Sequence, residues 1–359
     1  MCTHVNPVQC IIPPYMMEKI MQKTETKPAA FKEKVQAFAK DDAFRSRRQL
    51  FSKLNHDAKK VLFHESLKKV SAKKKVNRAV YTAKQKETQP GTLVRKEGQK
   101  PVKDKDVNNV YDAAGYTWDF YYSMFGRNSI DSKGMKIIQT VHYGVKYDNA
   151  FWDGQQMIYG DGDGKIFGSF TGDIDIIGHE LTHGVVQYEC NLAYKDQSGA
   201  LNESLADVFG TMIKQKTLNL DVKQADWLIG ENALLGNKYA LRSLKAPGTA
   251  YVNHPELGTD PQPATMSGYV NDPNDNGGVH TNSGIPNHAF YLAAYDIGGY
   301  SWEKAGRIWY AALTDTKLVK QTANFADFKN ATITHAQKLF PGNTTVLNAV
   351  SNAWKNVGV

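Results

Sequence analysis

The chain has 359 residues, of which 41% are hydrophobic and 22% are charged, an ordinary composition for a soluble globular protein. This length is enough for two domains and a further segment. No stretch approaches the roughly 18 apolar residues that a membrane-spanning helix needs, so we expect no membrane partner. The three cysteines, Cys2, Cys10 and Cys190, are too few for a disulfide framework.

The basic charge is confined to one end of the chain. Residues 1–75 contain 17 Lys and Arg against 7 Asp and Glu, a charge of +10, although the formal net charge of the whole chain is only +8. The remaining residues therefore carry a charge of −2. A nearly neutral body excludes an extended basic face, so we expect no nucleic-acid partner.

The first 75 residues form a distinct region. The start lacks the apolar run of a secretory signal peptide, so we expect a cytoplasmic protein or export by a leaderless route, with secretion possible. Pro13 and Pro14 predict an extended segment over 11–16. Apolar residues at helical spacing predict mostly helix over 18–70, and the basic run at 71–78 resembles an exposed proteolytic junction.

Residues 76–170 have the pattern of a β-rich half with one helix. Turn residues separate short β-prone runs at 136–145 and 156–160, and a helix is expected near 106–125. The segment DGDGKIFG at 161–168 begins like a calcium loop. It has Gly172 where an EF-hand needs its twelfth-position glutamate, so we expect a tight turn there.

From residue 172 onward the chain becomes helical. Amphipathic segments cover 173–189 and 200–215, and later helices are expected at 284–297, 301–314, 324–339 and 344–355. We therefore divide the chain into an N-terminal region, 1–75, a β-rich half, 76–178, and a helical half, 179–359.

The motif HELTH places His179 and His183 four residues apart, on one face of a helix, where both imidazoles can bind one metal ion. Glu180, one position round the helix, can reach a water on that metal. With ten histidines in the chain, the motif alone is only suggestive.

A second helix completes the set of ligands. Glu203 lies twenty residues after His183, enough for a turn and a returning helix. Two histidines and one glutamate leave the fourth position of a zinc ion open, as in a catalytic site. Asp207, one turn after Glu203, can accept the free N–H of a ligating histidine. A histidine on an apolar helix face is more often a core residue, but the joint spacing of the residues favours zinc.

Together these motifs resemble the thermolysin family of metallopeptidases. The resemblance lies in IDIIGHELTHGVVQYE, NLAYKDQSGALNESLADVFG, NAFWDGQQMIYGDGDG and DNGGVHTNSGIPNHAFY, from about residue 106 to the C-terminus. The segment IIPPYM resembles the short prosegments of the protealysin subgroup. The resemblance implies an α+β, two-domain thermolysin-like (gluzincin) fold with the zinc between the two halves, and a zinc-dependent neutral endopeptidase that processes its own precursor.

The resemblance also implies roles for individual residues. Zinc is bound by His179, His183 and Glu203, and Glu180 is the general base. His280 and Tyr194 stabilise the oxyanion, and Asp275 orients His280. The remaining implied residues are outer-shell partners, Asp207 and Asn202, and substrate-binding residues, Asn149, Ala150, Arg242, Phe167, Phe170, Ile176 and Leu241. The last four are apolar, so we expect cleavage before Leu, Phe, Ile or Val.

One group of residues departs from the family pattern. Asp175, Asp226 and Glu231 match the carboxylates that bind a calcium pair in thermolysin-type enzymes, but Lys214 and Leu228 stand where two further carboxylates are expected. A lysine supplies positive charge without a metal, and calcium needs six to eight oxygen ligands. We therefore expect no calcium pair.

Alternative functions are open to test. Metzincins need a third histidine where this chain has Glu189, and the exopeptidase motif G-A-M-E-N of related zinc aminopeptidases is absent. A basic binding protein with a decayed catalytic domain is disfavoured because every catalytic position holds a competent residue. We expect peptide or protein substrates, a monomer, and the prosegment as an intramolecular inhibitor. In a competing hypothesis, Cys2 or Cys10 blocks the zinc as a thiolate.

Overall fold

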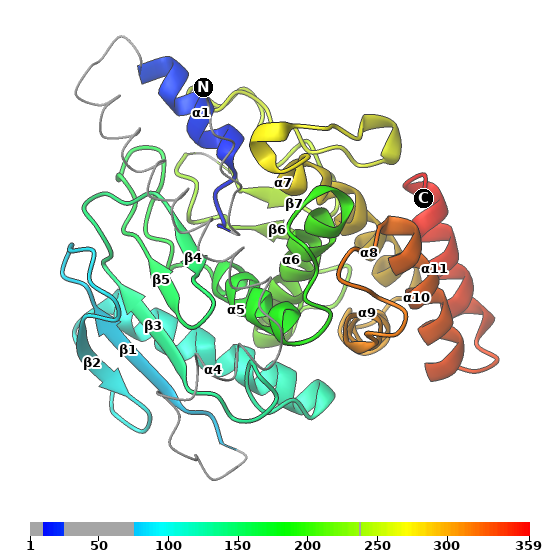
Figure 1. Cartoon of the computed structure of the whole chain (residues 1–359), viewed down its shortest axis with the longest axis horizontal. Helices are drawn as coiled ribbons and strands as arrows, with labels where there is room; N and C mark the ends of the chain where they lie inside the picture. The colour runs from blue at the N-terminus through cyan, green and yellow to red at the C-terminus, as the bar shows by residue number, and fades with distance from the viewer. Residues whose placement is uncertain (1–9, 25–74, 237) are drawn as a thin grey trace.

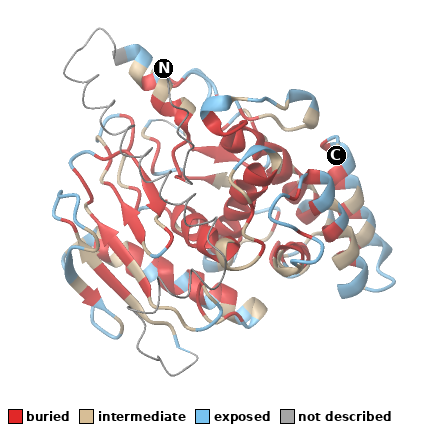
Figure 2. Cartoon of the chain, in the orientation of Figure 1, coloured by how far each residue is buried: buried red, intermediate tan, exposed pale blue. Residues whose placement is uncertain are grey.

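The computed structural model describes residues 10–24, 75–236 and 238–359. A β-rich part and a helical part lie on either side of two central helices, α5 and α6 (Figure 1). The expected α+β architecture is therefore confirmed. Buried residues are concentrated on these two helices and on the strands that face them (Figure 2).

The β-rich part contains one five-stranded sheet in the order β2-β1-β3-β5-β4. Its strands are β1 (Arg78–Thr82), β2 (Thr92–Lys96), β3 (Ile137–Val141), β4 (Ala150–Trp152) and β5 (Met157–Tyr159). The three inner strands are parallel, and β2 and β4 pair antiparallel at the two edges. Strand β4 is thus an edge strand, and an edge can pair with another extended segment.

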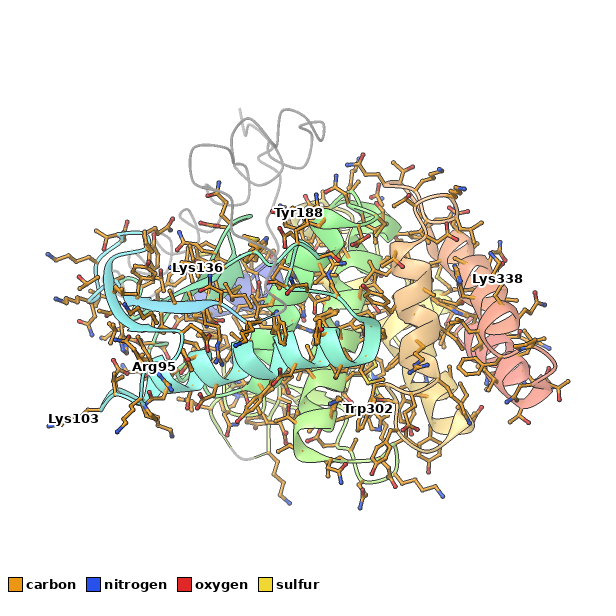
Figure 3. All side chains as sticks on the ribbon, turned by 90° about the horizontal axis from the view of Figure 1, so that it is seen from below. Arg95, Lys103, Lys136, Tyr188, Trp302 and Lys338 are labelled. Atoms are coloured by element: carbon orange, nitrogen blue, oxygen red, sulfur yellow. The ribbon has the colours of Figure 1, made fainter. Side chains whose placement is uncertain are left out.

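Helix α4 (Lys105–Phe125) confirms the helix expected over 106–125. Asp104 caps its N-terminus by accepting the N–H groups of Asp106 and Val107, and Gly126 ends it in the left-handed conformation with φ 68°. Its buried aromatic face packs against β1, β3 and α5. Figure 3 shows α4 running across the molecule, from the sheet toward the C-terminal helices.

The helical part contains α5 (Ile174–Tyr188), α6 (Asp196–Leu218), α7 (Val279–Asn282), α8 (Gly284–Ile297), α9 (Ala305–Thr314), α10 (Phe325–Leu339) and α11 (Thr344–Asn356). Short elements lie between α6 and α7: strands β6 (Leu228–Ile229) and β7 (Arg242–Ser243), and 3₁₀ turns η1 (Met266–Gly268) and η2 (Pro273–Asp275). The four late helices were expected from the sequence. Of these, α9 begins at Ala305 and not at 301 as expected, because residues 301–304 form a turn.

The prediction of an extended segment over 11–16 is wrong for its second half. Helix α1 covers Pro14–Thr24, with Pro14 at its first position, where a helix needs no N–H donor. The predicted helix over 18–70 is therefore borne out at its start, and its remainder lies outside the described residues, as do Phe31, Phe38, Phe51 and Leu54.

Two further expectations concern loops and membranes. The segment at 161–168 forms a turn in which Asp163 Oδ1 accepts the N–H groups of Lys165, Ile166 and Phe167, as expected. Within the described ranges, no helix has the length and apolarity required to cross a bilayer.

Candidate active site

Two glycines allow α5 and α6 to pack closely. A Cβ atom added at Gly210 would lie 2.5 Å from the backbone oxygen of Asp175, and one at Gly178 would lie 3.1 Å from Cα of Gly210. A larger residue at Gly210 would push the helices apart, and one at Gly178 would be tightly crowded. The close approach brings Glu203 on α6 beside the two histidines on α5.

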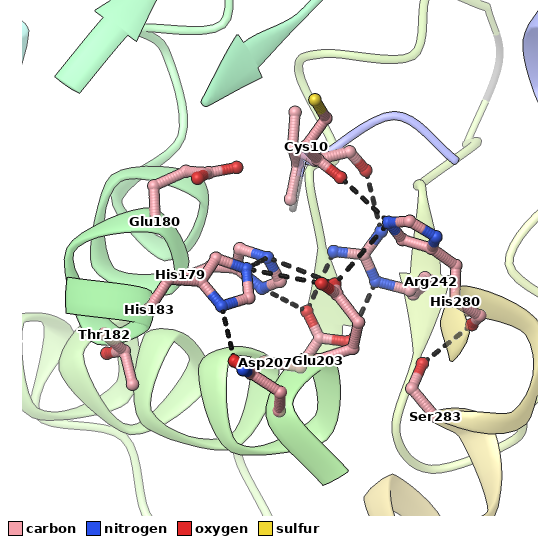
Figure 4. Close-up of polar contacts among 12 residues, drawn as sticks. Cys10, His179, Glu180, Thr182, His183, Glu203, Asp207, Arg242, His280 and Ser283 are labelled. Atoms are coloured by element: carbon pink, nitrogen blue, oxygen red, sulfur yellow. Dashed lines mark hydrogen bonds and ion pairs between the residues drawn. The ribbon is translucent and has the colours of Figure 1, made fainter. Parts of the chain in front are cut away.

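The two histidines and Glu203 converge on one point (Figure 4). His183 Nε2 lies 2.9 Å from His179 Nε2. Of the two Glu203 carboxylate oxygens, Oε2 lies 3.5 Å from His179 Nε2 and Oε1 lies 3.5 Å from His183 Nε2. All three side chains are buried. Glu203 Oε2 has no hydrogen-bond partner among the described residues, although it is shielded from solvent.

The other ring nitrogens define what this point can bind. His179 Nδ1 lies 2.7 Å from Asp207 Oδ1, and His183 Nδ1 lies 3.0 Å from Asn202 Oδ1. Both oxygens are acceptors, so each Nδ1 carries a hydrogen and the two Nε2 lone pairs face each other. Facing lone pairs beside a buried carboxylate repel unless a cation lies between them. Two imidazoles and one carboxylate are the protein ligands of a catalytic zinc, so these residues fit that ion.

Glu180 is held beside this point by the sheet. Its Oε2 accepts the backbone N–H of Trp152 on β4 at 2.9 Å, and the side chain is fully buried. Its carboxylate lies within 4.8 Å of the ligand atoms of both histidines. A carboxylate so fixed can take a proton from a water bound between it and the histidines.

His280 and Tyr194 form a second polar group on the other side of Glu203. His280 Nδ1 lies 2.5 Å from Asp275 Oδ1, and Nε2 lies 3.0 Å from the Tyr194 hydroxyl. That hydroxyl donates to Glu203 Oε1 at 2.5 Å. Burial, and then the Glu203 charge, raise the pKa of Tyr194 well above its usual value, so the phenol remains a donor.

The expected substrate-binding groups hold a segment of the chain itself. The N–H of Ile11 donates to the oxygen of Ala150 at 3.2 Å, and Arg242 donates to the oxygen of Ile11 at 2.9 Å. The N–H of Ile12 donates to Asn149 Oδ1 at 3.1 Å.

The residue before Ile11 reaches the catalytic groups. The Cys10 oxygen lies 3.2 Å from His280 Nε2, and Cys10 forms an antiparallel bridge with Phe151 on β4. Sequence reasoning placed Cys10 at this site only in the competing thiolate hypothesis, and it did not place Ile11 or Ile12 there. The only signal for it was the neighbouring PPY motif.

The thiol of Cys10 does not reach the histidines. The side chain belongs to an apolar cluster with Tyr143, Tyr147 and Phe151, and Figure 4 shows its sulfur pointing away from the histidine pair. Blocking of the metal by a Cys10 thiolate is therefore not supported, and Cys2 lies outside the described residues. Burial raises the pKa of Cys190 to about 12, which makes that thiol a poor nucleophile.

Asp207 links the histidines to the arginine that binds Ile11. It accepts two hydrogen bonds from Arg242, each 2.8 Å long, in addition to its contact with His179. Burial alone would raise the pKa of Asp207, but the charges of Arg242 and His179 outweigh it and the pKa lies well below its usual value. Asn287, which sequence reasoning missed, donates to Asp207 at 2.9 Å.

The four apolar residues expected beside the scissile bond come together in the core. They are fully buried in the same hydrophobic cluster as Ile11: Phe167, Phe170, Ile176 and Leu241. The rings of Phe167 and Phe170 lie 5.9 Å apart. The apolar side chain at position 11 is therefore buried in the same core as these four residues.

Lys214 lies at the centre of the carboxylates that match calcium ligands. Its ammonium is 3.2 Å from Asp175, 3.0 Å from Asp226 and 2.8 Å from Glu231. Burial would lower the pKa of Lys214, but these carboxylates hold it above its usual value. Burial, and then the charge of Asp175, raise the pKa of the neighbouring Asp173 to about 7.

A third charged cluster was not predicted from the sequence. His142, just after β3, lies 2.7 Å from Asp161 and 3.0 Å from Asp104, the residue that caps α4. Hydrogen bonding to Asp161, against the effect of burial, and the second bond to Asp104 raise the pKa of His142 to about 9. The protonated ring therefore ties the sheet to the start of α4 at neutral pH.

Comparison with known families agrees with this geometry. A model of the thermolysin metallopeptidase catalytic domain matches residues 50–187, and a model of the thermolysin metallopeptidase alpha-helical domain matches residues 190–359. The match begins well before residue 106, where the resemblance of the motifs starts.

Individual relatives cover most of the chain. An extracellular metalloprotease of Pectobacterium carotovorum subsp. carotovorum is 54% identical over 285 residues, 79% of this chain and 81% of the relative. Protease PrtS of Photorhabdus sp. (strain Az29) is 49% identical over 288 residues, 79% of this chain and 76% of the relative.

A solved structure is similar over almost the whole length. The precursor of protealysin, a metalloproteinase from Serratia proteamaculans, aligns with a TM-score of 0.82 and 44% sequence identity, and the alignment covers 98% of this chain and 100% of that one. The chain therefore belongs to the thermolysin family of metallopeptidases and is a zinc-dependent endopeptidase of the protealysin type.

Proposed function

We propose that this endopeptidase cuts peptide bonds before an apolar residue, and that its zinc is bound by His179, His183 and Glu203. The observation that carries the proposal is that the Nε2 atoms of His179 and His183 lie close to each other and to the Glu203 carboxylate. All three side chains are buried. When bound there, zinc lowers the pKa of a water and polarises a carbonyl group.

The roles of the remaining groups follow from their positions. Glu180 takes a proton from the attacking water and returns it to the leaving nitrogen, with Trp152 N–H holding the carboxylate in place. His280, oriented by Asp275, and Tyr194 donate to the carbonyl oxygen as it gains negative charge. Asp207 and Asn202 fix the tautomers of the two ligating histidines.

Substrate recognition combines backbone pairing and apolar burial. A substrate pairs with β4 through Ala150, with Asn149 and Arg242 binding the residues after the cut. Phe167, Phe170, Ile176 and Leu241 receive the side chain that follows the cut. A library of peptides that varies this one position tests the proposal. Charged residues there should reduce kcat/KM at least about tenfold relative to Leu or Phe, because an unpaired charge would be buried.

We also propose that residues 1–75 are a prosegment that inhibits the enzyme within its own molecule. The support is the contact of residues 10–12 with Ala150, Asn149, Arg242 and His280, the groups assigned to substrate. The basic run at 71–78 is the proposed junction for its removal. The catalytic halves are proposed to be 76–178 and 179–359, with α5 lying across this boundary, in a protein that is monomeric. The relative named extracellular metalloprotease favours export.

Lys214 is proposed to replace the calcium pair. Its ammonium already forms ion pairs with Asp175, Asp226 and Glu231, and Leu228 offers only a backbone oxygen, 3.4 Å from that ammonium. A calcium ion at this point would have to displace the lysine, with two carboxylates fewer to bind it.

The decisive experiment for the function is casein hydrolysis by the processed wild-type enzyme, with and without a zinc chelator. Activity should disappear on chelation and return when zinc is added. Activity that persists in the metal-free enzyme would contradict the assignment of the zinc site.

A further inference from the structure

Residues 10–12 run through the active site in the direction of a substrate. Ile11 gives its N–H to Ala150 and its carbonyl to Arg242, so the groups assigned to the residue after the cut are both occupied by Ile11. Its side chain is fully buried in the main hydrophobic core, which also contains the four apolar residues assigned to that position. The register of the segment is thus set by its backbone contacts.

The carbonyl that precedes Ile11 lies where a scissile carbonyl belongs. The Cys10 oxygen is 3.2 Å from His280 Nε2, one of the two groups assigned to the oxyanion. Cys10 also bridges to Phe151, the residue before Trp152, whose N–H holds the Glu180 carboxylate. Figure 4 shows Cys10 between Glu180 and His280, on the same side of the histidine pair.

The described part of the proposed junction, residues 75–78, cannot reach the same point in its own molecule without unfolding part of the sheet. The oxygen of Asn77 accepts the N–H of Ile137, and Arg78 begins β1, which pairs with strands on both sides. Strands β3 and β5 separate β1 from β4. Three strand spacings amount to about 14 Å. A bond within 75–78 is therefore available only to a second molecule while β1 stays paired.

We propose that the Cys10–Ile11 peptide bond is a processing site, cut within its own molecule before another molecule cuts the basic junction. This inference rests on the proposed function of the active site and of the prosegment. One water is consumed, and the bond between the Cys10 carbonyl carbon and the Ile11 nitrogen breaks. Cys10 gains a carboxylate, Ile11 gains an ammonium group, and Glu180 carries the proton from the water to the Ile11 nitrogen.

The cut loosens the block without removing it. Ile11 and Ile12 keep their contacts with Arg242 and Asn149 and remain joined to α1. Two new charges, however, now lie in a buried site where the intact peptide bond had none, which weakens the binding of the prosegment. Release of the block then exposes the active site to the junction of a second molecule.

The test follows the masses of the full-length chain after zinc is added to metal-free protein, over a wide range of protein concentration. Loss of residues 1–10 should be first order and independent of concentration, whereas loss of the whole prosegment should accelerate with concentration. Neither fragment should form in Glu180→Ala. Fragments that begin at Ile11 in Glu180→Ala, or that form only at high concentration, would overturn the proposal.

A second measurement separates this inference from the proposed inhibition. In the Glu180→Ala chain, Cys10 should be alkylated far more slowly than after unfolding, because it is fully buried. Adding Ile11→Asp should expose Cys10, and the matched Gln22→Asp change on the exposed face of α1 should not. A protected Cys10 with no cut before Ile11 overturns the inference alone. A Cys10 as reactive in Glu180→Ala as in the Ile11→Asp variant overturns the inhibition as well.

Discussion

The α5–α6 pair carries buried carboxylates in two places, and the two are neutralised in different ways. At the histidine site, Glu203 lies 3.5 Å from each of two facing imidazole nitrogens, and none of the described Lys or Arg side chains forms an ion pair with it. Near the start of α5, Asp175 lies 3.2 Å from the ammonium of Lys214. The same two helices therefore present one site that needs an external cation and one that contains its own.

The difference shows how burial decides the need for a metal. A buried carboxylate costs several kcal/mol unless a positive charge is close to it. Lys214 lies on α6, eleven residues after Glu203, and reaches Asp175 from the neighbouring helix. At the histidine site, the Nδ1 atoms of His179 and His183 are bound to Asp207 and Asn202, so their Nε2 atoms are left to bind zinc.

The largest effects are expected at the site that depends on zinc. Glu180→Ala should lower kcat by about a thousandfold or more, because the proton acceptor is lost. His183→Ala should abolish both activity and stoichiometric zinc. Metal analysis of the two purified variants beside the wild type distinguishes the roles. Zinc missing from Glu180→Ala would show that Glu180 is itself a ligand.

At the site with its own cation, Lys214→Met should destabilise the fold by about 3–5 kcal/mol, because it leaves the buried carboxylate of Asp175 unpaired. Urea unfolding measures this loss. The matched control is Lys216→Met on the same helix, whose effect should be within about 1 kcal/mol. Equal effects of the two changes would contradict the role given to Lys214.

The response to calcium tests whether Lys214 replaces the metal at its site. A calcium-selective chelator should leave the melting temperature of the wild type unchanged, because Lys214 occupies the centre of the carboxylates. Added calcium should partly restore the stability of Lys214→Met, where three carboxylates become available. A large drop in the wild-type melting temperature on chelation would show that a calcium site remains.

A smaller effect is expected from the partners of the ligating histidines. Asn202→Ala removes the acceptor 3.0 Å from His183 Nδ1 and should weaken zinc binding about 10–100-fold. Competition with a chromogenic chelator measures the affinity. Asn287→Ala, which removes a donor to Asp207 and touches neither histidine, is the matched control and should change zinc affinity less.

The smallest effect concerns the cluster in which a titratable ring supplies the positive charge. The pKa of His142 is raised to about 9 by Asp161 and Asp104, against the opposing effect of burial. Its stabilisation is complete below pH 6.5, the usual pKa of histidine, and is lost as the pH rises through about 9. The melting temperature of the wild type should therefore fall between pH 7 and pH 10 more steeply than that of His142→Gln. Parallel curves would rule out this role.

The sequence alone was sufficient wherever a short-range pattern carries the chemistry. Spacing within HELTH and NESLAD determined which residues share a helix face, and the geometry brings them together as the helical period requires. The helices at 106–125 and 284–297 were both expected from the sequence, and the structure has them within a residue or two of those bounds. Lys214 and Leu228 were recognisable as departures because the carboxylates around them matched a known pattern.

Only the tertiary structure decided which distant segments meet. That Cys10, Ile11 and Ile12 lie against β4, Arg242 and His280 depends on pairing across more than a hundred residues, and no local period encodes such pairing. The same holds for His142 between Asp104 and Asp161, and for Asn287 against Asp207. Pro14 was misread for a related reason, since a proline forbids the interior of a helix but favours its first turn, and only the fold fixes where that turn begins.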